Sequence, residues 1–229
     1  MKASKQAYGI SLGVFLIFIG FMIVGCEQNS PSAALSNPIG KVDLKSTPEK
    51  DFQPAKDRDP INPGGAVRTG ESGMVNIVFP DKSEITVKPE SYFELGAGEL
   101  LGQQKTGTVL YRFEKQKIGV RIKTPHGLTT VLGTTFALEV GSQSTVIYVE
   151  EGTVAFKPLN GEQKNVTRGQ QLIVSTHHEA PEMINVDPLK PQQTFQPGDE
   201  NLKLIDIDPF KLRQIFHPGE ENPKGINQH

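Results

Sequence analysis

Residues 74–88, MVNIVFPDKSEITVK, hold the clearest structural signal in the chain. Apolar side chains occupy alternate positions on both sides of the segment PDKS, namely Val75, Ile77 and Phe79 before it and Ile85 and Val87 after it. Alternate residues of a β-strand face the same side, and Pro followed by Asp is typical of a tight turn. The stretch therefore predicts a β-hairpin with one buried face.

The same alternation continues toward the C-terminus. It recurs over residues 118–123, 136–141 and 154–157, whereas residues 146–149 form a continuous apolar run, typical of a strand buried on both faces. Gly-containing turn signals separate these runs, and no window has a sustained helical period with caps. We predict an all-β domain, either an antiparallel or irregular β-sandwich or a short β-solenoid.

The prolines indicate how the 229 residues are organised. Six of the 17 lie between Pro31 and Pro63, seven lie between Pro181 and Pro223, and only four fall in between. One compact domain over residues 64–180 fits this distribution better than two domains. We expect an extended N-terminal linker and an extended C-terminal tail on either side of it.

Charge and cysteine content exclude several classes of function. The formal net charge of −2 is not that of a nucleic-acid-binding protein, which would have a clustered basic excess. A single Cys excludes an internal disulfide, a cysteine-based zinc site and an iron–sulfur cluster.

The N-terminus predicts export. Lys2 and Lys5 precede an uncharged stretch at 6–25 that is long enough to be either a signal peptide or a membrane helix. The sequence Ile-Val-Gly-Cys that ends at Cys26 resembles the bacterial lipobox, which implies cleavage between Gly25 and Cys26 and acylation of Cys26. The alternative is an uncleaved helix with an incidental Cys. Acyl chains hold a protein on a membrane without a spanning helix.

The segment after Cys26 is predicted to be a flexible linker over residues 26–63, because it is rich in Ser, Pro, Asn, Lys and Asp and has no hydrophobic period. Glu27 follows the Cys, where many inner-membrane lipoproteins have Asp. We therefore expect a cell-envelope protein that is anchored to the outer membrane and faces the periplasm.

Four ordered blocks of the predicted domain resemble the FecR family. They are GAVRTG at 65–70 with the hairpin and the PES turn at 89–91, then IKTP at 122–125 with VLGTTF at 131–136, then VIYVEEGTV at 146–154, and finally RGQQ at 168–171. The resemblance covers residues 64–174 and implies the family's β domain.

The founding FecR-type proteins are transmembrane regulators with a cytoplasmic anti-sigma segment, and they receive a signal from a TonB-dependent receptor. This chain departs from them at its N-terminus, where acylation of Cys26 would leave no spanning helix. The resemblance therefore implies the fold and the binding of periplasmic proteins, whereas a sigma-regulator role would need a separate membrane protein.

No pattern in the chain predicts catalysis, a cofactor or a metal site. His177, His178 and Glu179 form the only histidine cluster, and adjacent residues of a strand point to opposite sides. Asp81 and the pair Glu150 and Glu151 are expected in turns, where acidic residues are common. We therefore predict a protein that is not an enzyme.

The predicted tail, 181–229, contains an internal repeat. Residues 184–201 recur 21 residues later as 205–222, and ten of the 18 aligned positions are identical. Both copies contain a Phe followed by Pro-Gly, and these residues are the candidates for partner binding: Phe195, Pro197, Gly198, Phe216, Pro218 and Gly219.

Three interpretations of the repeat remain open. In the first, the copies pack on the β domain. In the second, they are extended ligands for a partner, and linking the two copies raises the overall affinity through a higher effective concentration. In the third, they are a duplicated solvated linker. The Pro-Gly segments lack the alternating acidic positions of an EF-hand loop, which argues against calcium binding.

Together these features predict a lipid-anchored, non-catalytic envelope protein that binds a protein or peptidoglycan partner and no nucleic acid. One alternative is a periplasmic sensor that acts with a separate membrane protein in FecR-type iron or sigma-factor signalling. A less favoured alternative is a carbohydrate-active enzyme on a β-solenoid, which would need two carboxylates about 5 to 10 Å apart in a cleft.

Overall fold

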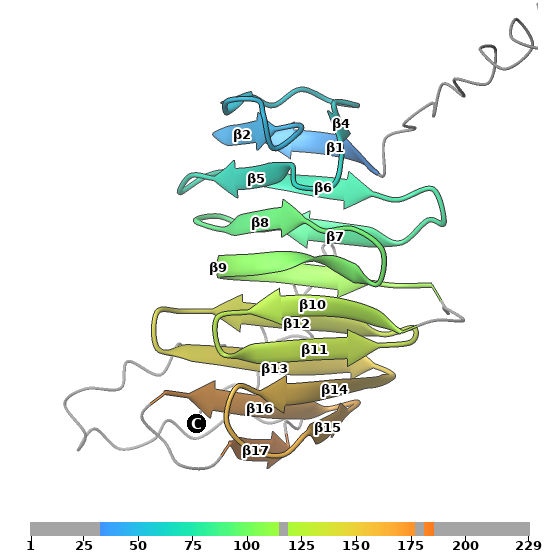
Figure 1. Ribbon diagram of the computed structural model, residues 1–229, viewed down its shortest axis with the longest axis vertical. Helices are drawn as coiled ribbons and strands as arrows, with labels where there is room; N and C mark the ends of the chain where they lie inside the picture. The colour runs from blue at the N-terminus through green and yellow to red at the C-terminus, as the bar shows by residue number, and fades with distance from the viewer. Residues whose placement is uncertain (1–32, 115–118, 177–180, 186–229) are drawn as a thin grey trace, which may run out of the picture. The chain divides into compact units, whose positions relative to one another are not determined.

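The computed structural model describes residues 33–114, 119–176 and 181–185. These residues form 17 strands and no helix (Figure 1), which confirms the predicted all-β class. Among them there is consequently no helix that could cross a membrane.

The strands form two sheets that lie face to face (Figure 1). Sheet A has, in spatial order, β4 (Pro60–Ile61), β1 (Ala33–Ile39), β6 (Met74–Val78), β7 (Glu84–Val87), the second half of β9 (Leu100–Arg112), β12 (Thr135–Val140), β13 (Ser144–Glu151), β16 (Gln170–Ser175) and β17 (Glu182–Asn185). Sheet B has β3 (Gln53–Pro54), β2 (Val42–Lys45), β5 (Ala66–Thr69), β8 (Tyr92–Leu95), the first half of β9, β10 (Val120–Thr124), β11 (Gly127–Val131), β14 (Thr153–Pro158) and β15 (Lys164–Thr167). Neither sheet closes into a barrel.

Strand β9 belongs to both sheets. Its residues 100–106 pair with β8 and β10 in sheet B, and its residues 107–112 pair with β7 and β12 in sheet A. The chain changes sheet at Gly107, which has a φ of +83° that L-residues with a side chain rarely adopt. Pairing is antiparallel throughout the described strands except between β9 and β10.

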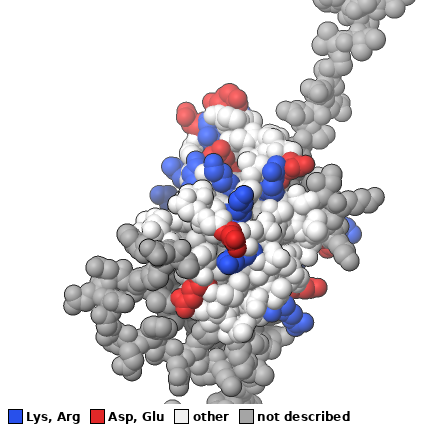
Figure 2. Space-filling view, turned by 60° about the horizontal axis from the view of Figure 1, so that its bottom comes forward, with Lys and Arg blue, Asp and Glu red and all other residues white. Residues whose placement is uncertain are grey.

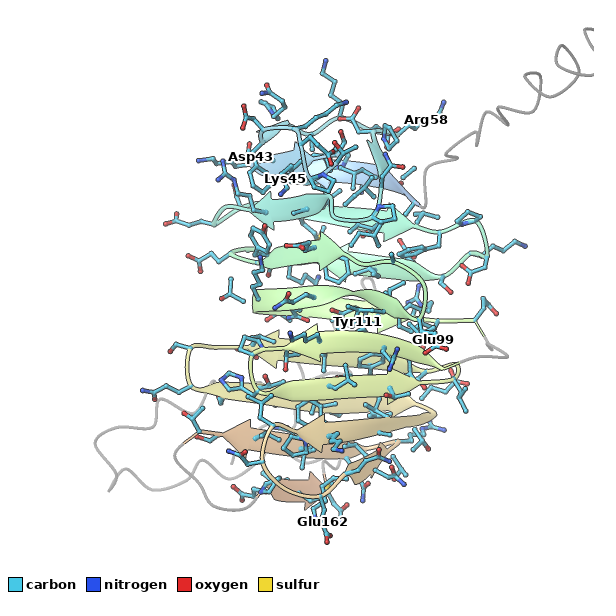
Figure 3. All side chains as sticks on the ribbon, in the orientation of Figure 1. Asp43, Lys45, Arg58, Glu99, Tyr111 and Glu162 are labelled. Atoms are coloured by element: carbon cyan, nitrogen blue, oxygen red, sulfur yellow. The ribbon has the colours of Figure 1, made fainter. Side chains whose placement is uncertain are left out.

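One hydrophobic core lies between the sheets, because both inner faces supply alternate apolar residues to it. The ring of Tyr111 stacks on Phe136 with centroids 4.9 Å apart, and Phe93 meets Tyr111 edge-on. Figure 3 shows Tyr111 near the middle of the stack of strands, whereas Arg58 and Glu162 lie at its opposite ends.

A buried amide supports the strand that changes sheet. Gln104 is fully buried, and its Nε2 donates to the carbonyls of Gly107 at 2.7 Å and Leu138 at 3.0 Å. Its Oε1 accepts a hydrogen bond of 2.9 Å from the hydroxyl of Tyr111. The polar atoms of this side chain are therefore satisfied where β9 leaves sheet B.

The predicted hairpin is confirmed. Strands β6 and β7 pair with Val75 opposite Val87 and Ile77 opposite Ile85, and all four side chains are buried. In the turn, Asp81 accepts hydrogen bonds from the amide and hydroxyl of Ser83, a turn role as expected for this residue.

The prediction of a flexible linker over residues 26–63 is wrong for its described part, residues 33–63. These residues form β1 to β4, and the side chains of Leu35, Val42, Leu44 and Ile61 are buried in the common core. The frequent Pro and Ser residues do not prevent this, because β1 to β4 lie at the end of the stack, where a residue without an amide donor is tolerated. The domain therefore begins at least 30 residues earlier than residue 64.

Candidate functional site

Most of the residues predicted to carry function lie outside the described part of the chain. This applies to Gly25 and Cys26 at the N-terminus and to every partner-binding candidate in the tail, namely Phe195, Pro197, Gly198, Phe216, Pro218 and Gly219. The first repeat copy begins within β17, so Ile184 and Asn185 are its two described residues.

In residues 33–114, 119–176 and 181–185, no three His, Cys, Asp or Glu side chains lie so that they could share a metal ion. The one described histidine, His126, is buried, and its Nδ1 lies 2.8 Å from the Thr145 hydroxyl. Burial lowers the pKa of this imidazole. His126 therefore has a structural environment at the turn between β10 and β11.

A ladder of charged and aromatic side chains lies on the outer face of sheet B. Strand register places Asp43, Arg68 and Tyr92 side by side on β2, β5 and β8. Three further residues complete what we call the sheet B ladder, namely Phe52, Glu94 and Lys105. Figure 3 shows Asp43 near one end of the stack.

Short contacts connect the ladder. Arg68 Nε donates to Asp43 Oδ2 at 3.0 Å, and its guanidinium carbon lies 4.3 Å from the centre of the Phe52 ring. Phe52 meets Tyr92 edge-on with ring centres 6.2 Å apart.

The other end of the ladder follows the same pattern. Lys105 Nζ lies 4.7 Å from the Tyr92 ring centre and donates to Glu94 Oε2 at 2.9 Å. The hydrogen bond that Lys105 donates to Glu94 is the main reason why the pKa of Lys105 is raised. Two adjacent rings, Phe52 and Tyr92, thus lie between the cations Arg68 and Lys105.

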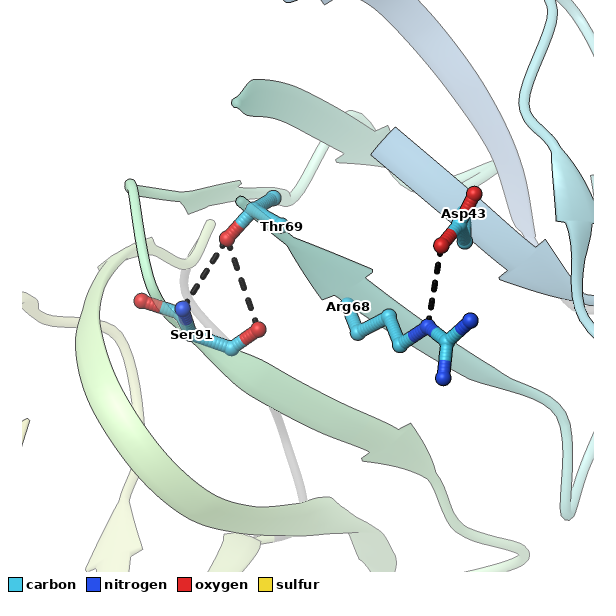
Figure 4. Close-up of polar contacts among 4 residues, drawn as sticks. All are labelled: Asp43, Arg68, Thr69 and Ser91. Atoms are coloured by element: carbon cyan, nitrogen blue, oxygen red, sulfur yellow. Dashed lines mark hydrogen bonds and ion pairs between the residues drawn. The ribbon is translucent and has the colours of Figure 1, made fainter. Parts of the chain in front are cut away.

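Buried hydrogen bonds beside Arg68 fix the orientation of the strand that carries it. Thr69, next to Arg68 on β5, points inward and accepts a 2.9 Å hydrogen bond from the Ser91 amide (Figure 4). Its hydroxyl donates to the Lys88 carbonyl at 2.6 Å. Because adjacent strand residues face opposite sides, fixing Thr69 in the interior displays Arg68 outside.

The ladder adds little to stability. The side chains of Arg68 and Lys105 are 53% and 45% exposed, and exposed ion pairs and cation–π contacts contribute about 0 to 1 kcal/mol each. Arg and Tyr are also the residue types most enriched where proteins bind one another. The ladder is therefore the candidate interaction surface of the domain.

Sequence reasoning missed every residue of the ladder. Asp43 and Phe52 fall in the segment predicted to be a linker, although Val42-Asp43-Leu44-Lys45 does alternate apolar and charged residues. Phe52, Tyr92 and Lys105 lie on separate segments, and no local pattern connects them.

Charges of both signs lie on the face that Figure 2 shows, where Lys and Arg side chains are interspersed with Asp and Glu. A face with such a distribution has no field of a single sign.

Comparison with known proteins agrees with the fold. Residues 65–155 match the family model described as FecR protein. The resemblance seen in the sequence is thus confirmed for this part, and the chain contains a FecR domain.

Two crystal structures, at 1.65 Å and 2.50 Å resolution, also match; both are of a protein from Parabacteroides distasonis ATCC 8503 that is described as a candidate anti-sigma factor. In each case the sequence identity is 12% and the TM-score is 0.48, over 53% of this chain. The match spans 60% of that protein's crystallised chain. A search of the curated proteins found no match.

Proposed function

We propose that this protein is a lipid-anchored, non-catalytic component of the cell envelope whose FecR domain binds a protein or cell-wall partner. The observation that carries the proposal is the sheet B ladder, an exposed row of rings and cations that adds little to the fold. The domain's described acidic ladder residues, Asp43 and Glu94, each pair with a cation, which supports recognition rather than hydrolysis.

The anchor is tested at Cys26. Substitution Cys26→Ala removes the thiol that acylation requires, so we expect an uncleaved, unacylated precursor in cell fractions, with a larger mass than the parent. Fractionation of intact cells with mass spectrometry of the N-terminal peptide measures both. Unchanged size and acylation would refute the anchor and leave the ladder proposal standing.

Partner binding is tested at the ladder. We expect Arg68→Ala combined with Tyr92→Ala to weaken the capture of crosslinked envelope partners at least tenfold, because hot-spot side chains of these types carry about 2 kcal/mol or more. Lys157→Ala, an exposed substitution on β14 of the same sheet, is the matched control. Equal capture by all three proteins would contradict a binding role of the ladder.

The FecR match favours one second function, that of a sensor acting with a separate membrane protein in FecR-type iron or sigma-factor signalling. Deletion of the gene would then change sigma-dependent transcripts, and the ladder variant would reproduce the change. Normal transcripts in both strains would exclude this role and leave the binding proposal intact.

A further inference from the structure

The outer face of sheet A carries an apolar patch. Register places Leu110, Ala137 and Tyr148 in one row across β9, β12 and β13, and Glu139, Val146 and Ile173 in the next row across β12, β13 and β16. Their strand neighbours, among them Leu138, Ile147 and Leu172, point into the core. The outer patch, defined here as Leu110, Ala137, Val146 and Ile173, therefore points away from it.

Three of the four residues of the outer patch are nevertheless buried, and Ile173 is half-buried. Leu110 is 7% exposed, Ala137 4% and Val146 6%, and none of the three belongs to the core cluster between the sheets. All strands of the described residues belong to the two sheets, so no described strand forms a third layer over this face. In the apolar run at 146–149, Val146, Ile147 and Val149 are buried and Tyr148 is half-buried, so the outer face of this strand is partly buried as well as its inner face.

Charged neighbours of the patch show the same loss of water. Lys88, Thr108 and Glu139 follow one another across β7, β9 and β12 on this face. Burial raises the pKa of Glu139 to about 7 and lowers the pKa of Lys88. Neither shift has an ion pair as its cause.

The last described strand lies at the edge of the sheet that carries the outer patch. The last described strand, β17, is the edge of sheet A, and Ile184 pairs with Gln171 in the row of Leu110 and Ala137. Ile184 is the first residue of the first repeat copy and is half-buried on the outer side. The copy therefore starts at the rim of the patch.

The tail is long enough to reach the patch. Four strand spacings of about 4.8 Å separate β17 from β9, about 19 Å in all, and about six extended residues span this distance. Phe195 lies ten residues beyond Asn185, and 44 residues follow Asn185 in total. A segment tethered this closely has an effective concentration of the order of millimolar, higher than that of a second copy or a partner in dilute solution.

We propose that the first repeat copy, residues 184–201, folds back over the outer face of sheet A and places Phe195 on the outer patch. The copy then acts as an internal ligand of the FecR domain, and one of the three interpretations of the repeat, packing on the domain, applies to it. The inference does not depend on the sheet B ladder, which lies on the opposite outer face.

Photo-crosslinking in the full-length protein tests the contact. With Phe195→benzoylphenylalanine, we expect intramolecular crosslinks to peptides that contain residues 107–112, 135–140 or 144–151. The same probe at Leu159, which is 71% exposed, is the control and should not label these peptides. Crosslinks only to other proteins, only between two copies at high concentration, or to no part of sheet A would each overturn the proposal.

Matched lysine substitutions give a second readout. Ala137→Lys places a charge in the outer patch, and Ala155→Lys places the same charge on the outer face of sheet B. We expect trypsin to cleave the tail at Lys203 about tenfold faster in Ala137→Lys and in Phe195→Ala, a factor equivalent to about 1.4 kcal/mol, and at the parent rate in Ala155→Lys. Phe195→Ala keeps the test valid if Ala137→Lys fails to fold. Equal rates in all four proteins would show that the tail is unprotected and would refute the contact.

Discussion

The hydrogen bond between Tyr111 and Gln104 offers a test of how the two sheets are joined. Tyr111→Phe removes the donor to Gln104 Oε1 inside the core, and Gln104→Met removes the amide with little change in volume. The first variant leaves one buried acceptor without a partner, and the second leaves the Tyr111 hydroxyl and two carbonyls without theirs.

The expected magnitudes follow from the number of partners lost. A buried polar group without a partner costs about 1 to 3 kcal/mol, so we expect a loss of about 1 to 2 kcal/mol for Tyr111→Phe and about 2 to 5 kcal/mol for Gln104→Met. The double variant should lose about 1 kcal/mol less than the sum of the two, since it removes both partners of one bond.

Urea unfolding followed by circular dichroism suits this protein, because the chain has no Trp. Burial raises the pKa of Tyr111 well above its ordinary value, so the phenol stays neutral in the buffers that such assays use. Strictly additive losses would refute the coupling and with it the role assigned to Gln104 as a link between β9 and the core.

Three further perturbations have expected outcomes. The folded-state pKa of Glu139 is raised from 4.5 to about 7, so its contribution to stability is complete below pH 4.5 and is lost as the pH rises through about 7. Glu139→Gln should therefore raise the unfolding free energy at pH 8 by about 1 to 2 kcal/mol, after allowance for solvent screening, and leave it unchanged at pH 4. Equal gains at both pH values would contradict the assignment. Gly107→Ala should destabilise the domain by more than 1 kcal/mol in chemical denaturation, since the backbone φ is +83° and a Cβ would lie 2.2 Å from the Ser91 hydroxyl oxygen; an unaffected midpoint would disprove this reason for the glycine. Leu35→Ala should cost about 2 to 5 kcal/mol in thermal or urea unfolding, whereas Ile39→Ala, at a 46% exposed side chain, should be nearly neutral; equal effects would show that β1 is not part of the core.

Local sequence patterns predicted the hairpins well, because alternation and turn chemistry act within about ten residues. At Glu151-Gly152, for example, a Gly-containing turn signal coincides with a turn in which Gly152 has a φ of +87°. The strands of residues 33–63 were not predictable in this way. They are two to seven residues long, and what stabilises them is burial against distant strands such as β5 and β6, which composition does not reveal.

The candidate site was the least predictable part. The sheet B ladder combines residues from β2, β5, β8 and β9, which are neighbours only because of the sheet order. By contrast, the apolar run at 146–149 predicted a strand that is buried on its outer side as well. The sequence alone did not show that Leu110 and Ala137 lie near Val146 in the sheet.

If Cys26 is lipid-anchored as proposed, the strands formed by residues 33–63 also limit how far the domain can lie from the membrane. Seven peptide links separate Cys26 from Ala33. At about 3.6 Å per residue at most, the distance between these two residues cannot exceed about 25 Å. A linker extending to residue 63 would have allowed a distance of about 130 Å. If Cys26 is acylated as proposed, Ala33 lies within about 25 Å of the acylated residue. A partner would then have to reach the membrane surface, and a binding assay on supported bilayers would reproduce that geometry better than one in free solution.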